Sequence, residues 1–209
     1  MTATKEIAVS LVALGLASDP AALAFTPLTG GVSSDIWCVR GGHAPLCVKR
    51  ARSQLAVEAK WEVAVERNHF EAEFLRVVEL EVPGLAPALL AEDESQGFIV
   101  LPYLDPSEWQ LWKPQLLAGH VDSAVAEAVG THLGKLARVT RDRPELLQQF
   151  DTTGLFHALR LDPYILECAR RHPDLAPALT ALADATAARR ESLVHGLSLI
   201  HISEPTRRT

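Results

Sequence analysis

The sequence predicts an α+β protein with a mixed strand-and-helix first half and a mainly helical second half. Short apolar runs alternate with glycine-rich or polar turns up to Leu101, which is the pattern of an antiparallel meander. Beyond residue 106, apolar residues recur three and four positions apart, which is the spacing of amphipathic helices. The change of pattern over residues 101–106 therefore predicts a boundary between two parts of the chain.

Composition excludes several classes of protein. The chain has 209 residues, of which 48% are hydrophobic and 22% charged, as in ordinary globular domains. Its net charge is −6 and its basic residues are scattered, so we expect no nucleic-acid partner. No apolar run approaches the roughly 20 residues that a membrane span needs. We therefore expect a cytoplasmic protein that does not enter a membrane.

Cysteines and histidines show no metal-ligand spacing. The three cysteines, Cys38, Cys47 and Cys168, are expected to be buried, reduced thiols. The histidines share no ligand pattern either, so no metal site is predicted among them.

The first predicted element is a helix. Apolar residues of 4–17 lie at helical spacing, and Asp19-Pro20 ends the run, so we expect a helix that faces the core. A cleaved signal peptide is the alternative, because small residues at 22–24 imitate a cleavage site. Glu6 and Asp19-Pro20 interrupt the required pattern and favour the helix.

Strands follow this helix. Residues 26–39 flank a glycine turn and predict two strands, and residues 46–50 predict a third strand that includes Lys49. Residues 54–80 predict a long acidic helix, with a break near Arg67-Asn68, that ends at Val82-Pro83-Gly84.

The remaining elements are two more strands and then helices. Residues 89–91 and 97–101 read as strands joined by a polar loop over Glu92–Gln96. Later helices are expected at 124–140, 163–172 and 175–191.

Three features in this order point to phosphate chemistry. The turn that contains Gly30, Gly31, Ser33 and Ser34 lets backbone N–H groups approach phosphate oxygens, because glycine has no Cβ. A strand lysine follows at Lys49, and an acidic helix follows the lysine. Each feature alone is an ordinary hairpin, a solvated lysine or a charged helix face, so the prediction rests on their order.

At the residue level, this order resembles the aminoglycoside phosphotransferase family. The turn resembles the family's Gly-Gly-x-Ser hairpin, and residues 70–76 resemble its Glu-Ala-x-x-Leu-Arg helix. The similarity spans roughly residues 5–196. It implies the protein-kinase-like bilobal fold shared with choline and methylthioribose kinases, here with an incomplete helical C-lobe. The expected parts are a nucleotide-binding N-lobe (1–100), a hinge (101–106) and a partial C-lobe (107–196).

The resemblance also implies roles for particular residues. Lys49 is expected to hold the α- and β-phosphates of ATP, with Glu71 orienting it and Glu73 as the second choice. Backbone groups of the hinge, at Leu101 and Tyr103, are expected to bond the adenine edge. Val48 and Ile99 are expected to enclose the ring.

The segment from Val194 onward resembles the start of a kinase catalytic loop. The family pattern is His-Gly-Asp, whereas this chain has His195, Gly196 and then Leu197. His195 is a remnant that would support the loop, because the catalytic aspartate and the later metal ligands are absent. Residues 197–209 resemble a translated sequencing adapter and are expected to be non-native.

The resulting hypothesis is the N-terminal fragment of an ATP- and magnesium-dependent phosphotransferase. The acceptor would be a hydroxyl group of a small molecule, such as an aminoglycoside, a sugar or an amino alcohol. We expect the chain to be inactive as written. A non-catalytic, pseudokinase-like nucleotide-binding module and a helical interaction protein are the alternatives.

Overall fold

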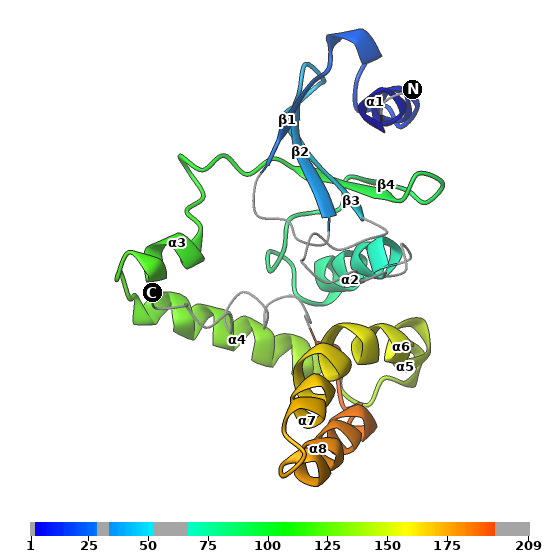
Figure 1. The fold of residues 1–209 in the computed structure, drawn as a ribbon. Coiled ribbons are helices and arrows are strands. Elements are labelled where there is room, and N and C mark those ends of the chain that lie inside the picture. Colours follow the sequence, from blue (N-terminus) through cyan, green and yellow to red (C-terminus); the bar gives the residue numbers. More distant parts are fainter. Residues whose placement is uncertain (1–2, 29–33, 52–66, 195–209) are drawn as a thin grey trace. The chain divides into compact units, whose positions relative to one another are not determined.

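A computed structural model describes residues 3–28, 34–51 and 67–194 of the chain (Figure 1). These residues belong to two compact units. One unit contains residues 1–103 and 151–190, and the other contains residues 104–150 and the segment that starts at Glu191.

The first unit contains a five-stranded, wholly antiparallel sheet. Its strands follow the order β1-β2-β3-β5-β4. Their bounds are Ala24–Pro27 (β1), Ser34–Arg40 (β2), Leu46–Ala51 (β3), Ala91–Asp93 (β4) and Phe98–Pro102 (β5). The predicted antiparallel meander of β1, β2 and β3 is confirmed.

The turn between β2 and β3 requires glycine. Gly41 has a φ of +97°, and a Cβ atom there would lie 2.1 Å from the carbonyl oxygen of Ala22. A side chain at this position would therefore clash with backbone as well as strain the turn.

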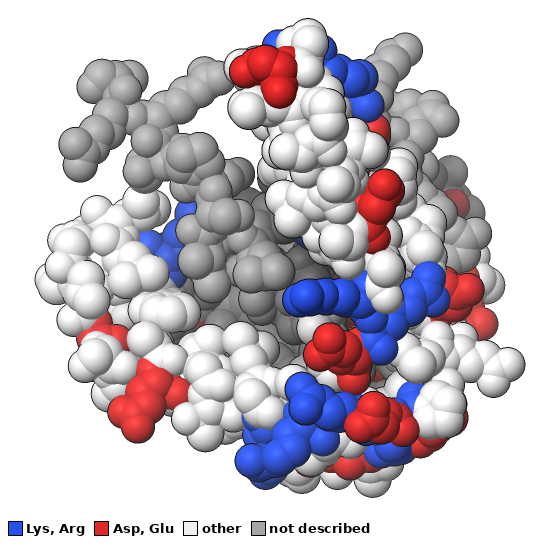
Figure 2. All heavy atoms as spheres, turned by 90° about the horizontal axis from the view of Figure 1, so that it is seen from below, with Lys and Arg blue, Asp and Glu red and all other residues white. Residues whose placement is uncertain are grey.

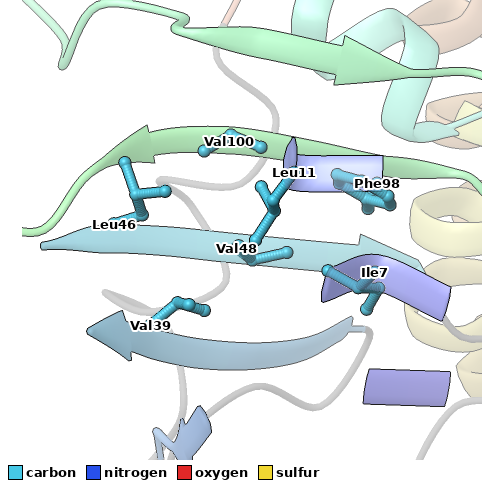
Figure 3. Close-up of a cluster of buried hydrophobic side chains, with 7 residues drawn as sticks. All are labelled: Ile7, Leu11, Val39, Leu46, Val48, Phe98 and Val100. Atoms are coloured by element: carbon cyan, nitrogen blue, oxygen red, sulfur yellow. The ribbon is translucent and has the colours of Figure 1, made fainter. Parts of the chain in front are cut away.

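One face of the sheet packs against α1 (Ala3–Ala13) (Figure 3). Ile7 and Leu11 are completely buried there. They contact a cluster formed by Val39, Leu46, Val48, Phe98 and Val100. The predicted core-facing helix is confirmed, although it ends at Ala13, before Gly15 with its φ of +74°.

The opposite face packs against α2 (Arg67–Glu81), so the two helices lie on opposite sides of the sheet (Figure 1). Ala72 and Leu75 of α2 contact Ile99 of β5. The helix ends immediately before Val82-Pro83-Gly84, as predicted. The part of the predicted helix before residue 67 lies outside the described residues.

The predicted position of β4 was wrong. The strand is Ala91–Asp93 rather than residues 89–91, so Glu92 and Asp93 belong to the sheet and not to the loop. Glu92 lies opposite Ile99, and its side chain is only 6% exposed. A buried carboxylate is tolerated here because Arg76 donates to it at 2.7 Å.

The second unit contains α3 (Trp112–Leu117), α4 (Ser123–Thr140) and α5 (Pro144–Gln149). The carboxylate of Asp122 caps α4 by accepting a hydrogen bond from the N–H of Ala124 at 2.8 Å. The predicted helix over 124–140 is confirmed, and Leu136 of its apolar stripe is buried.

Residues 151–190 of the first unit are helical. They form α6 (Thr153–Phe156), the π-helical segment η2 (His157–Leu166), α7 (Glu167–Arg171) and α8 (Ala176–Ala188). The predicted start at Pro163 was wrong, because the helical path begins ten residues earlier, at Thr153. Pro163 lies inside η2. Proline has no backbone N–H to donate within a helix, and the wider π-helical turn occurs at this position.

Charged side chains of this segment pair with one another. Arg170 donates to Glu167 at 2.7 Å and to Asp162 at 2.9 Å, and Arg171 donates to Glu167. Figure 2 shows basic and acidic side chains interspersed on the face that it draws. Among the described helices, none is long and apolar enough to cross a bilayer.

Candidate functional site

The alternation of β3 separates two sets of side chains. Val48 lies in the cluster on the α1 face, so Cys47 and Lys49 point to the α2 face. Ile99 of β5 is the register partner of Lys49 and belongs to the α2 cluster. The predicted enclosure of a ring between Val48 and Ile99 was therefore wrong, because the two side chains lie on opposite faces of the sheet.

Lys49 is paired with α2. Its Nζ atom lies 2.6 Å from both Oε1 and Oε2 of Glu71. The lysine side chain is 16% exposed and the glutamate side chain 22% exposed. The sequence predicted this pairing. Glu73, the second choice, pairs instead with Arg76 one turn further along the same helix.

Asn68 holds the first turn of α2 against the sheet. Its amide Nδ2 donates to the carbonyl oxygen of Lys49 at 3.2 Å and to that of Gly97 at 2.6 Å. The residue is 3% exposed. This contact fixes the helix next to the strand that bears Lys49. Sequence reasoning missed it, and the expected helix break at Arg67-Asn68 was the one signal nearby.

A second clasp joins α2 to β4. Arg76 donates a hydrogen bond to the carboxylate of Glu92. This bond is the main reason that the pKa of Arg76 is raised, against a smaller opposing effect of burial. His69 lies 3.3 Å from the same carboxylate. Both contacts orient α2 on the sheet.

One group in the described part of the chain has the spacing of metal ligands. Ligand atoms of His69, Glu92 and Glu94 all lie within 4.8 Å of one another. However, Glu92 is already engaged by the guanidinium of Arg76, and strand β5 lies between Glu92 and Lys49. These residues do not fit a magnesium ion, which prefers oxygen ligands in an octahedron close to the phosphates.

The cysteines differ from expectation. Cys38 is buried, but Cys47 is half-buried and Cys168 on α7 is exposed, so the prediction of three buried thiols holds for Cys38 alone. Burial raises the pKa of Cys47. The Lys49 ammonium opposes this shift, while Cys38 and Glu71 add to it.

The hinge residues are partly engaged within the sheet. The backbone N–H of Tyr103 donates to the carbonyl oxygen of Pro45 at 3.2 Å, so it is not free for an adenine. Leu101 lies opposite Cys47 in the ladder of β3 and β5. The ring of Tyr103 lies under Arg40, whose Cζ atom is 5.1 Å from the ring centroid.

The remaining predicted site residues lie next to or outside the residues that the structure describes. Ser34 begins β2 and is buried, opposite Ala51. Gly30, Gly31, Ser33 and His195 lie outside the described residues. The structure therefore brings together Lys49, Glu71 and the strands around them.

A five-stranded antiparallel sheet with a strand lysine clasped by a helix glutamate, combined with helical segments, defines a kinase-like α+β protein. Comparison with protein families supports this class. The model of the phosphotransferase enzyme family (APH) matches residues 24–201. The chain therefore belongs to this family of phosphotransferases. A search of curated proteins found no relative that matches the sequence.

Proposed function

We propose that the chain provides the ATP-binding part of a phosphotransferase that phosphorylates a hydroxyl group of a small molecule. Aminoglycosides, sugars and amino alcohols are the acceptor classes that suit this family. The observation that supports ATP binding is the Lys49–Glu71 pair, in which one ammonium group meets both oxygens of one carboxylate at 2.6 Å.

This pair has the properties of a phosphate clamp. An ammonium group has three N–H donors, and Glu71 accepts from the direction of α2. The partial burial of both side chains lowers the local screening of their charges by water. Lys49 is thus held in one orientation before a nucleotide arrives. Phosphoryl transfer depends mainly on such positioning and on neutralisation of phosphate charge.

A residue outside the Lys49–Glu71 pair is expected to accept the proton of the attacking hydroxyl group. The resemblance places an aspartate directly after Gly196, where this chain has Leu197. A leucine side chain accepts no proton. Magnesium would supply charge neutralisation at the phosphates, but the group of His69, Glu92 and Glu94, which has ligand spacing in the described part of the chain, does not fit it. We therefore expect this chain to bind ATP without transferring phosphate.

Thermal unfolding in the presence of ATP tests the proposal. A ligand that binds only the folded state at 100 times its Kd stabilises that state by about 2.7 kcal/mol. The wild-type melting temperature should rise with ATP, Lys49→Ala should abolish the rise, and Glu71→Gln should reduce it. Lys135→Ala, which removes an exposed lysine of α4, is the matched control. A full shift in Lys49→Ala would refute the site.

A non-catalytic nucleotide-binding module is the second candidate, because Leu197 occupies the position expected for the catalytic acid. Both candidates predict the ATP-dependent shift. Both also predict that the purified chain transfers no phosphate, so phosphorylation of any acceptor would contradict both. Sequencing the source locus past the codon for Gly196 distinguishes them: an aspartate followed by an asparagine favours the phosphotransferase, and a locus that encodes Leu197 there favours the non-catalytic module.

A further inference from the structure

Two cysteines lie directly opposite each other in the middle of the sheet. Cys38 of β2 is the register partner of Cys47 of β3. Both side chains lie on the sheet face of Lys49. Cys47 is two residues from Lys49 on β3, and Cys38 is two residues from Ile36, the register partner of Lys49, on β2. The proposed nucleotide site gives this pair no role.

The hydrogen-bond pattern shows which kind of cross-strand pair this is. Leu28 donates to Ile36, so the backbone groups of Cys38, two residues on, point toward β1. Tyr103 donates to Pro45, so those of Cys47 point toward β5. The two cysteines therefore form a non-hydrogen-bonded pair, in which Cα atoms lie about 4.5 Å apart and side chains are at their closest.

This geometry permits a covalent bond. Disulfides span Cα–Cα distances of about 4.4 to 6.8 Å, so the pair lies at the short end of the permitted range. Both thiols are free. Cys47 is half-buried, so its thiolate can reach a dissolved oxidant. Cys38 is 1% exposed, so it reacts only with the sulfur of Cys47.

We propose that Cys38 and Cys47 form a redox-sensitive dithiol that closes into a cross-strand disulfide in the presence of a low-molecular-weight disulfide such as oxidised glutathione. The proposal does not depend on nucleotide binding. A bond at the short end of the permitted range is strained, so it should open again readily with a dithiol reductant.

The reaction proceeds by two thiol–disulfide exchanges. The Cys47 thiolate attacks one sulfur of the oxidant, which breaks its S–S bond and releases one glutathione thiolate. Cys38 then loses its proton and attacks Sγ of Cys47, which releases the second glutathione thiolate. The two protein thiols lose two electrons and two protons, and one glutathione disulfide becomes two glutathione thiols. Because burial raises the pKa of Cys47, closure should become faster as pH rises.

The experiment uses the full chain with Cys168→Ser, which leaves Cys38 and Cys47 as its two thiols. The protein is incubated with oxidised glutathione, acid-quenched, alkylated in denaturant and weighed by intact mass spectrometry. We expect a species without alkyl groups or glutathione that is lighter by two hydrogen atoms, and its reversal by dithiothreitol. A persistent glutathione adduct on Cys47 beside an alkylated Cys38, or two alkylated thiols, would overturn the proposal.

Single-thiol variants and an unfolded control complete the test. In the Cys168→Ser background, Cys38→Ser should accumulate a stable Cys47–glutathione adduct, and Cys47→Ser should remain largely unmodified because Cys38 is buried. The same reaction in concentrated urea measures closure without the sheet. A ratio of intramolecular disulfide to adduct that is no higher in native buffer than in urea would also contradict the proposal.

Discussion

At the scale of single residues, Asn68 joins three segments through one buried amide. Its Nδ2 group reaches a carbonyl of β3 and a carbonyl of the turn before β5, while its backbone belongs to α2. Its Oδ1 atom is buried and has no hydrogen-bond partner within the described structure. The amide therefore serves as a donor to two carbonyl groups, which a carboxylate of the same shape cannot do.

Substitution of Asn68 tests this role. Asn68→Ala removes the side-chain donor of two backbone carbonyl groups, which should cost about 1–3 kcal/mol of unfolding free energy. Asn68→Asp should cost more, because a carboxylate would face two carbonyl oxygens. Urea unfolding measures both, with Glu79→Ala on the exposed face of α2 as the control. An Asp variant as stable as wild type would show that the contacts are incidental.

Asp93 makes stability depend on pH. Burial raises the pKa of this carboxyl, but hydrogen bonds from Ser10, Ser95 and the N–H of Gln96 outweigh burial and lower the pKa below its ordinary value of 3.8. A carboxyl with a lowered folded-state pKa stabilises the protein above its unfolded-state pKa. That contribution is lost as the pH falls through the folded-state value.

The measurement is the unfolding free energy of wild type and Asp93→Asn from pH 6 down to pH values below 3.8. Wild type should be more stable at pH 6, and the difference should shrink as the pH falls. Ser10→Ala should reduce the difference, because it removes one of the donors. A difference that stays constant over the whole range would show that the interaction is independent of ionisation.

At the scale of elements, α1 is stable because it packs against the sheet. It has 11 residues, and isolated helices of this length are marginal in water. Ile7 and Leu11 are completely buried against strands β2, β3 and β5 (Figure 3). Removal of apolar volume at this interface should therefore destabilise the sheet and the helix together.

Ile7→Ala should lower the unfolding free energy by about 2–5 kcal/mol, and Ile7→Val by about 0.5–1.5 kcal/mol. Val9 of the same helix is 56% exposed, so Val9→Ala should change stability by less than about 0.5 kcal/mol. Denaturant titrations followed by circular dichroism give all three values. Equal effects at residues 7 and 9 would contradict the packing in Figure 3.

Some elements of the fold could be predicted from the sequence alone and others could not. The first three strands were predictable, because glycine turns and apolar runs are local signals. The Lys49–Glu71 pair was predictable only through the resemblance of residues 70–76 to the family's Glu-Ala-x-x-Leu-Arg helix. The two faces of the sheet were not, since Val48 and Ile99 look alike in sequence and only the register assigns them to opposite sides. The position of β4 was missed for a similar reason: the partner that lets Glu92 be buried, Arg76, lies 16 residues away.

At the scale of the whole molecule, the net charge favours solubility, whereas exposed apolar side chains in one segment favour self-association. The net charge is −6, and the charged side chains are interspersed on the face drawn in Figure 2. Residues 109–121 of the second unit, in contrast, expose large apolar side chains. Trp109 is 58% exposed, Leu111 71%, Leu117 64% and Val121 82%. Several such side chains within one short segment are a liability for self-association.

We therefore predict that the combined variant Leu111→Gln, Leu117→Gln and Val121→Thr aggregates less than wild type while melting at nearly the same temperature. The substitutions keep the net charge, so a change in aggregation would reflect apolar exposure alone. They remove few buried contacts, so folding should be little affected. Static light scattering against protein concentration, beside thermal unfolding, measures both properties. Leu80→Gln is the control, because Leu80 is 78% exposed but lies on α2, away from this segment in the sequence. If the Leu80 variant suppressed scattering as strongly as the combined variant, the segment 109–121 would not be the source of association.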